Sequence, residues 1–286
     1  MLSYRHGFHA GNHADVLKHL VFVQLLRHLA LKDKAFWCVD THAGAALHDL
    51  GSTFAQKHRE YESGIARLWE SAKLPGALSD YVNEVRRNNP DGALRFYPGS
   101  PQLALQLLRS QDRLRLFELH STESRTLADY FTPARQGAAA KRVAVTGGDG
   151  FELLKSVLPP PPRRGVVLLD PSYEDRNDYR HVIVALREGL ERFATGLYAV
   201  WYPQVQRRES RQLPESLERL PGVDWLHVTL TVKQPQADGF GLHGSGMFVV
   251  NPPHTLAAAL REVMPLLAGW LAQDDGAKFT LNERSS

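Results

Sequence analysis

The chain has 286 residues, of which 43% are hydrophobic and 23% charged, a composition typical of a folded globular protein and not of a disordered or fibrous one. Its single cysteine, Cys38, excludes an internal disulfide and a cysteine-based zinc site. No apolar run approaches the ~20 residues needed to cross a bilayer, and no signal-peptide core follows the first residues. We therefore expect a cytoplasmic protein without membrane contact, whose net charge of +3 permits binding to nucleic acid.

Residues 1–12 are polar, aromatic and glycine-containing, which predicts an arm in front of the first helix. Asn12 is a typical N-cap, and Asp15 follows three residues later as in a capping box. Apolar residues then recur at helical spacing to about Lys32. Histidines are frequent in this region, but no cysteine or acidic set completes a ligand shell around them, so we expect no bound metal.

A first strand is predicted at residues 35–39, followed by Asp40, Thr41, His42 and a small turn containing Gly44. An acid at a strand end before such a turn is typical of the first strand–helix junction of nucleotide-binding folds. The turn lacks the Gly-x-Gly-x-x-Gly pattern, which speaks against a standard dinucleotide site.

The alternation of strands and helices that is typical of a parallel sheet is absent between residues 50 and 96. Apolar residues there recur at helical spacing, at residues 61–69 and 78–85. We therefore predict a small helical insertion at residues 50–96 within a main domain formed by residues 1–49 and 97–286. The chain returns to that domain at residues 97–101, and a helix is predicted from Pro101 to about Arg109.

Three further strands end at or near an acid. Glu118 ends the strand at residues 114–120, where it could accept hydrogen bonds from ribose hydroxyls. Asp149 follows the strand that begins at Val143, where it could accept from an adenine amino group, with Phe151 against the ring. Asp170 follows the continuous apolar run at residues 165–169, which is typical of a buried parallel strand. Because parallel strands end at one edge of a sheet, these acids predict a ligand site there.

One reaction in particular is suggested by the run Asp170, Pro171, Ser172 and Tyr173. A carboxylate and a backbone carbonyl, each accepting one N–H of an exocyclic amino group, free the nitrogen lone pair for attack, while an aromatic ring stacks on the base. The run resembles the Asp/Asn-Pro-Pro-Tyr/Phe motif of amino-group methyltransferases. Ser172 replaces the second proline, which affects the stiffness of the turn but not the carbonyl of Pro171.

The remaining elements complete an α/β pattern. A helix is predicted at residues 179–192 and a strand at residues 197–202, followed by an antiparallel pair at residues 225–232 and 246–250. Asn251 and Pro252 begin a second Asn-Pro-Pro run, but this run lacks the stacking aromatic residue. We interpret it as a strand-to-helix turn.

With these motifs in view, the chain closely resembles the RlmJ family of ribosomal large-subunit RNA adenine-N6 methyltransferases over nearly its full length. The resemblance rests on residues 4–6, 9–19, 40–44, 97–101, 118–120, 149–151, 201–203 and 245–247. It implies a Rossmann-like class I S-adenosylmethionine-dependent methyltransferase fold with the helical insertion. It also implies a monomer that uses S-adenosylmethionine and no metal to methylate adenine 2030 of 23S rRNA at N6.

The resemblance also implies roles for individual residues. Asp170, Pro171 and Tyr173 would form the catalytic turn, with Asp170 receiving the amino hydrogen bond or proton. Contacts to the methyl donor would come from His19, His42, Ser100, Glu118, Asp149, Gly150 and Asp170. The RNA substrate would be faced by Tyr4, His6 and Lys18.

Three other functions share parts of this pattern. A DNA adenine-N6 methyltransferase would use the same catalytic turn. A protein methyltransferase that modifies glutamine uses a similar turn that begins with asparagine, so Asp170 argues against it. A non-catalytic RNA-binding protein with this fold would not bind the methyl donor.

Overall fold

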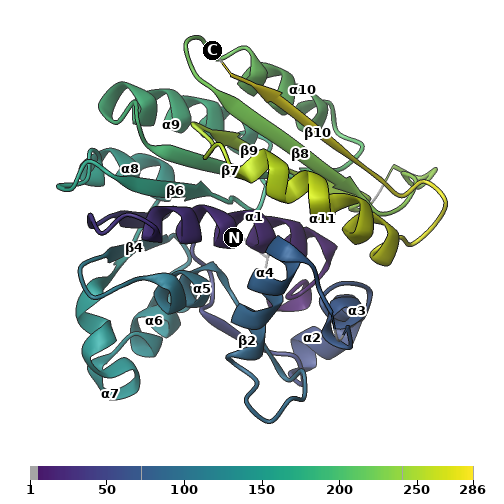
Figure 1. Cartoon of the computed structure of the whole chain (residues 1–286), viewed down its shortest axis with the longest axis horizontal. Coiled ribbons are helices and arrows are strands. Elements are labelled where there is room, and N and C mark those ends of the chain that lie inside the picture. The colour runs from purple at the N-terminus through teal and green to yellow at the C-terminus, as the bar shows by residue number, and fades with distance from the viewer. Residues whose placement is uncertain (1–5, 72, 240, 286) are drawn as a thin grey trace.

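The computed structural model describes residues 6–71, 73–239 and 241–285, and within these residues a twisted eight-stranded sheet forms the centre of the molecule (Figure 1). Its strands are β1 (Trp37–Asp40), β4 (Arg113–Glu118), β5 (Val143–Gly147), β6 (Gly165–Leu169), β7 (Leu197–Gln204), β8 (Trp225–Thr231), β9 (Gly244–Val250) and β10 (Lys278–Arg284). They lie in the order β10-β8-β9-β7-β6-β1-β4-β5.

The strands β5, β4, β1, β6 and β7 are parallel, and the direction in which the chain adds strands reverses between β1 and β6. Strand β9 lies antiparallel between β7 and β8. This is a Rossmann-like arrangement, which confirms the predicted fold class, and the predicted late antiparallel pair is present. Ligands of such sheets bind at the reversal point, at the carboxyl ends of the strands. Here that point lies between Asp40 and Asp170.

Helices cover both faces of the sheet. One core cluster contains Val166 and Leu168 of β6 together with α1, α4, α5 and α11, and the other contains Val167 and Leu169 with α8, α9 and α10. Strand β6 is therefore buried on both faces, as its continuous apolar run predicts. The longer helices are α1 (His13–Ala30), α4 (Gly76–Arg86), α5 (Ser100–Leu107), α6 (Ser121–Tyr130), α8 (Gly150–Val157), α9 (Asp178–Arg192), α10 (Arg208–Glu218) and α11 (Leu256–Trp270).

Asn12 is the N-cap of α1, as predicted, because its Oδ1 accepts hydrogen bonds from the backbone N–H groups of Ala14 and Asp15 at 2.9 and 3.0 Å. The carboxylate of Asp15 accepts from the N–H of Gly11 at 2.9 Å, one residue earlier than in a capping box. Residues 10–12 are buried, so this part of the predicted arm belongs to the packed protein.

The segment predicted as an insertion, residues 50–96, contains the helices α2 (Thr53–His58), α3 (Ala66–Trp69) and α4, with short turns before or between them. A two-stranded antiparallel ladder, β2 (Leu47–Asp49) with β3 (Phe96–Pro98), closes its base and was not predicted. The predicted helix over residues 61–69 is instead a 3-10 turn, Glu60–Ser63, followed by α3. The break falls at Gly64, where any side chain would collide with the backbone of Gly11 and Asn12.

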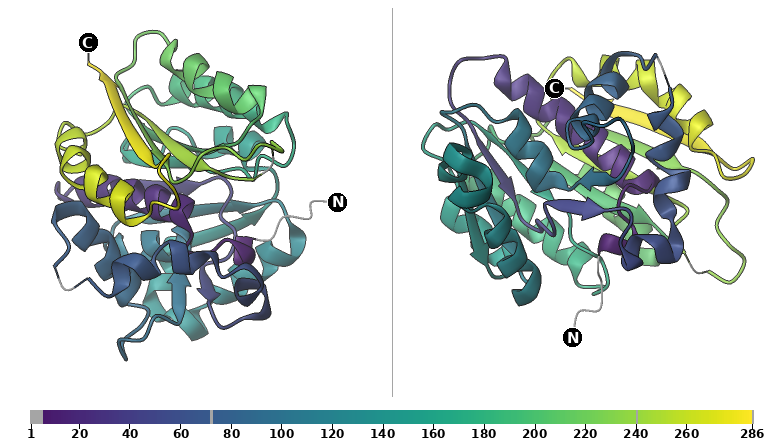
Figure 2. Two further views of the ribbon diagram at one scale, coloured as in Figure 1. Left: turned by 90° about the vertical axis from the view of Figure 1, so that its right-hand side faces the viewer. Right: turned by 90° about the horizontal axis from the view of Figure 1, so that it is seen from below.

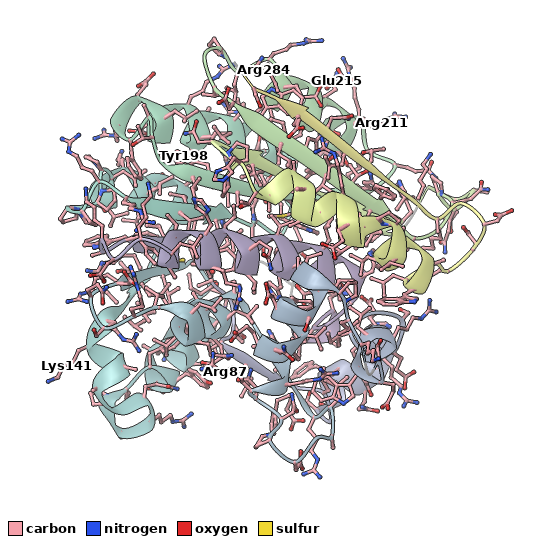
Figure 3. All side chains as sticks on the ribbon, in the orientation of Figure 1. Arg87, Lys141, Tyr198, Arg211, Glu215 and Arg284 are labelled. Carbon is pink, nitrogen blue, oxygen red and sulfur yellow. The ribbon has the colours of Figure 1, made fainter. Side chains whose placement is uncertain are left out.

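The edge strand β10 was also not predicted (Figure 2). Its sequence alternates polar with half-buried residues and lacks the apolar run of a central strand. Arg284 anchors it by donating hydrogen bonds to the carbonyls of Glu218, Leu220 and Val223 at the end of α10, near Arg211 and Glu215 in Figure 3. Two further short helices, α7 (Pro133–Gln136) and a 3-10 helix, Gly137–Arg142, precede β5.

Candidate active site

A cavity of about 1380 Å³ lies at the carboxyl ends of β1, β4, β5 and β6, where the strand order reverses. All the predicted site residues whose side chains the structure describes line this one cavity: Lys18, His19, His42, Ser100, Glu118, Asp149, Gly150, Asp170, Pro171 and Tyr173. Tyr4 lies outside the described residues, and so does the side chain of His6. The residues that the sequence motifs and the family resemblance indicated thus come from six separate segments that meet at one place.

Lys18 binds the carboxylate of the predicted catalytic turn. Its Nζ donates to Asp170 Oδ2 at 2.7 Å and lies 2.9 Å from Asp15 Oδ1. The three side chains are only 6%, 13% and 1% exposed, respectively. Burial alone would lower the pKa of Lys18, but the two carboxylates outweigh burial and raise it, so the side chain is an ammonium. A buried cation thus joins α1 to the turn after β6.

Asp40 ends the neighbouring strand β1 and is fully buried. It accepts a hydrogen bond from the hydroxyl of Ser100 at 2.6 Å and one from the N–H of His42 at 3.2 Å. The pKa of Asp40 is raised to about 7 as the net result of several effects: burial and the nearby Asp170 raise it, while the two hydrogen bonds and Lys18 lower it. The Ser100 hydroxyl thus donates its proton to Asp40, and its oxygen can only accept a hydrogen bond from a ligand in the cavity.

The state of His42 follows from its neighbours. The hydroxyl of Thr41 donates its only proton to the carbonyl of Leu168 at 2.9 Å, so it accepts from His42 Nδ1 at 2.8 Å. Burial lowers the pKa of His42 to about 4, so the ring is neutral with its lone pair on Nε2. The ring meets Phe151 edge to face at 4.6 Å. These two rings form an aromatic wall of the cavity.

Glu118 connects two turns. Its Oε2 accepts from the N–H of Gly44 at 2.9 Å and its Oε1 from the N–H of His120 at 2.8 Å. Each oxygen keeps a second lone pair for a ligand. Asp149 caps α8 by accepting from the N–H of Phe151 at 2.8 Å. Beside it, Gly150 lies so close to the carbonyl of Thr41 that no side chain fits, which explains the glycine.

His19, a predicted contact of the methyl donor, is only 1% exposed. Its Nδ1 forms a hydrogen bond with the hydroxyl of Tyr97 at 2.7 Å, and that hydroxyl contacts the hydroxyl of Tyr81 at 2.9 Å. All three side chains are buried. This chain of polar groups joins α1 to the insertion and holds His19 at the base of the cavity.

Comparison with known proteins identifies the family to which this chain is related. The model of the family described as "Ribosomal RNA large subunit methyltransferase D, RlmJ" matches residues 33–281. The chain belongs to the RlmJ family. It is 46% identical over 267 residues to the "Ribosomal RNA large subunit methyltransferase J" of Escherichia coli, covering 93% of each chain, and 43% identical over 282 residues to that of Haemophilus influenzae, covering 98% of each.

A solved structure also matches the full fold. The crystal structure of protein LPL1258 from Legionella pneumophila superposes with a TM-score of 0.86 at 33% identity, covering 97% of this chain and 99% of that one. The family relationship confirms the resemblance inferred from the motifs. In the part of the chain that the structure describes, no helix has the length and apolar character to span a membrane, and no group of three or more metal-binding side chains is present.

The predicted catalytic turn of this RlmJ-family chain differs from the sequence-based expectation at Tyr173. The residue has a φ of +55°, its hydroxyl donates to the carbonyl of Trp201 at 2.7 Å, and its ring packs 4.5 Å from the ring of Tyr179. Only 2% of Tyr173 is exposed, so the ring that was expected to stack on a base has almost no free surface. The left-handed backbone directs the ring into the core, where it anchors the turn.

Arg207 is a further contact of this turn, and its role is not apparent from the sequence. Its Nη1 donates to the carbonyl of Tyr173 at 3.0 Å, and the residue lines the cavity. The two residues are 34 positions apart, so no local sequence signal connects them.

We predict that Arg207→Ala lowers kcat by roughly 2- to 10-fold, the rate equivalent of losing one hydrogen bond that orients the turn. Affinity for the methyl donor should change little, since Arg207 contacts the turn only at the carbonyl of Tyr173, which is not one of the predicted donor contacts. Arg208→Ala is the control, because Arg208 is an exposed neighbour in the first turn of α10. Single-turnover rates at saturating substrate test the prediction, and equal rates for the two variants would contradict it.

Proposed function

We propose that the chain transfers the methyl group of S-adenosylmethionine to the N6 amino group of one adenine in 23S rRNA, adenine 2030 by family resemblance. The observation that carries the proposal is the position of Asp170. Its carboxylate and the adjacent carbonyl of Pro171 lie at the carboxyl end of β6, in the same cavity as Glu118 and Asp149. Hydrogen-bond acceptors for an amino group and for a nucleoside-like methyl donor thus lie in the same cavity.

The side chains present fit S-adenosylmethionine, which when bound supplies a methyl group already activated on sulfonium sulfur. Glu118 offers lone pairs to ribose hydroxyls, and the wall of His42 and Phe151 fits an adenine ring. Leu119, 54% exposed, adds an apolar surface beside Glu118. The cavity volume of about 1380 Å³ exceeds the roughly 300–1,000 Å³ of a pocket for one small ligand. The excess is consistent with a donor and a substrate base held together.

The protein's part in the proposed reaction is alignment. Asp170 and the Pro171 carbonyl accept the two N–H bonds of the adenine amino group and orient its lone pair toward the methyl group. Lys18 already donates to Asp170 Oδ2, so the amino group shares the carboxylate with the ammonium or displaces the ammonium toward Asp15. The adenine must leave its stack to enter, so an exposed or extruded base in folded RNA is the natural substrate.

We further propose that the protein acts as a cytoplasmic monomer, without a metal, and that Tyr4 and His6 approach the RNA together with Lys18. The direct test is transfer of tritium from labelled donor to total RNA lacking the modification, followed by nucleoside analysis. Label in N6-methyladenosine of 23S rRNA supports the proposal. Preferential labelling of DNA in a competition assay would favour the DNA alternative, and absence of donor binding in calorimetry would favour a non-catalytic RNA-binding protein.

Glu118→Ala should weaken donor binding more than RNA binding. Charge-assisted hydrogen bonds contribute about 1.5–3 kcal/mol each, so we expect the donor Kd to rise by roughly 10- to 150-fold for one lost bond. The substitution also frees the turns at Gly44 and His120. Titration calorimetry with the donor measures the effect, and Glu123→Ala, on a nearby acid that also lines the cavity, is the control. Equal donor affinity in the two variants would refute the role.

A further inference from the structure

The lysine and arginine side chains that line the described part of the cavity differ in what binds them. They are Lys18, Arg176, Arg207 and Lys233. Lys18 is bound by two carboxylates, Arg207 donates to the carbonyl of Tyr173, and Arg176 is exposed between β6 and α9. Lys233 is half-buried, and its ammonium has no hydrogen-bond or ion-pair partner among the described residues. It is therefore available to an anion that enters the cavity.

Lys233 lies two residues beyond the end of β8, at the same edge of the sheet as Asp170. Strand β9 is antiparallel to both β7 and β8, so β8 runs parallel to β7 and ends at the same edge. In the strand order, β9 and β7 separate β8 from β6, so the ends of β8 and β6 are three strand spacings apart, about 14 Å. Glu118 and Asp149, the predicted donor contacts, lie on the other side of the strand reversal. Lys233 thus lies on the substrate side of the cavity.

Gln273, which follows α11, lies beside Lys233 and also lines the cavity. Its backbone N–H donates to the carbonyl of Val232 at 2.7 Å, which attaches it to the residue next to Lys233. Its side-chain Nε2 lies 3.4 Å from Ser63 Oγ, and the amide has a second N–H to donate. The segment after β8 is therefore fixed next to a neutral hydrogen-bond donor.

His13, in the first turn of α1, belongs to the same part of the cavity. It is only 5% exposed, and its Nδ1 is buried without a hydrogen-bond partner among the described residues. Burial and the nearby charge of Lys233 lower the pKa of His13 to about 4, against the opposing effect of two nearby acids, so the ring is neutral with one N–H to donate. One of these acids, Glu60, uses its two oxygens to accept from His9 and Asn12. A buried polar atom without a partner marks a position that a ligand can satisfy.

We propose that Lys233, together with Gln273 and His13, binds a backbone phosphate of the RNA strand next to the target adenine. The inference rests on the proposed function and adds to it the place where the strand is held. Phosphate oxygens accept hydrogen bonds from an ammonium, an amide N–H and an imidazole N–H, which are the three donors present. Phosphate contacts fix the position of a nucleic acid without reading its sequence. Such a contact positions the strand while the extruded base reaches Asp170.

The test measures methyl transfer to unmodified, transcribed 23S rRNA at several salt concentrations. With the protein in excess, the protein concentration that gives half-maximal single-turnover transfer reports the Kd for the target site. Lys233→Gln should raise this Kd by about 10-fold, which corresponds to losing one charged hydrogen bond of about 1.4 kcal/mol. The slope of log Kd against log salt concentration should become shallower by about 0.7–0.9, because one phosphate fewer is neutralised. Lys233→Arg should keep both values close to those of the parent.

Gln273→Ala separates the neutral donor from the charge. It should raise the Kd for RNA by about 2- to 10-fold, since it removes a neutral hydrogen bond, and it should leave the salt slope unchanged. We expect the donor Kd, measured by calorimetry, to be unchanged in the variants of Lys233 and Gln273.

Lys278→Gln is the matched control, because it removes the same charge nearby. Lys278 is exposed on β10, pairs with Thr231 at the end of β8 and does not line the cavity. An RNA Kd for Lys233→Gln no higher than that of Lys278→Gln overturns the inference. A raised Kd with an unchanged salt slope also overturns it, since the charge of Lys233 would then not be what binds the RNA. If the parent protein itself transfers no methyl group to RNA, the proposed function fails, which is a separate result.

Discussion

Asp170→Ala is expected to abolish methyl transfer while leaving the protein folded. The substitution removes the carboxylate that orients the amino group, and no other side chain of the catalytic turn replaces it. Contributions of a positioned acid or base are typically about 10²- to 10⁴-fold in rate. Lys18 keeps one carboxylate partner, Asp15, at 2.9 Å, so the buried ammonium is still paired and the fold should persist.

The measurement is single-turnover transfer of label to unmodified 23S rRNA, with thermal unfolding followed in parallel. Asp170→Asn separates two roles of the carboxylate. Asparagine accepts a hydrogen bond through its oxygen but is a far weaker proton acceptor, so partial activity favours hydrogen bonding over proton abstraction. A folded Asp170→Ala protein with a rate within a few-fold of the parent would remove Asp170 from the proposed mechanism.

Local sequence patterns predicted the parts of the site that depend on strand ends. The apolar run before Asp170 is continuous because β6 is buried on both faces, and such a run must be a central strand. Asp40, Glu118 and Asp149 follow strands or turns of the same parallel sheet, whose carboxyl ends meet at one edge. Topology therefore brought them together, as predicted.

What the sequence could not predict depends on contacts between distant segments. Lys18 lies on the first helix, and its partner Asp170 is 152 residues further along the chain. The buried position of Tyr173 depends on a positive φ, and a tyrosine in the sequence does not indicate this backbone conformation. The polar edge strand β10 lacks an apolar pattern because half of its surface faces solvent. Each missed feature is set by tertiary packing, which overrides local propensity.

Replacing the buried ammonium of Lys18 is expected to have the second large effect, on the stability of the fold. Lys18→Met is expected to destabilise the fold by about 3–5 kcal/mol near pH 7, because it removes the buried ammonium that binds the carboxylates of both Asp15 and Asp170. The pKa of Lys18 is raised in the folded protein, so its stabilising contribution is complete below its unfolded value of 10.5 and is lost only at higher pH. The parent therefore has this stabilisation throughout the neutral range.

The loss in Lys18→Met should shrink as the pH falls, because protonation of either carboxylate removes the repulsion that the substitution creates. Adding Asp15→Asn to Lys18→Met should restore part of the stability, since one of the two neighbouring negative charges is then gone. Urea unfolding of the three proteins between pH 5 and pH 8 checks both expectations about these buried charges. Arg27→Met is the control, because Arg27 lies on the same helix and its ion pair with Asp80 is much more exposed than that of Lys18. If Lys18→Met is no less stable than Arg27→Met, the two carboxylates do not need the ammonium. The ion pairs of Lys18 would then not stabilise the contact between α1 and the turn at Asp170.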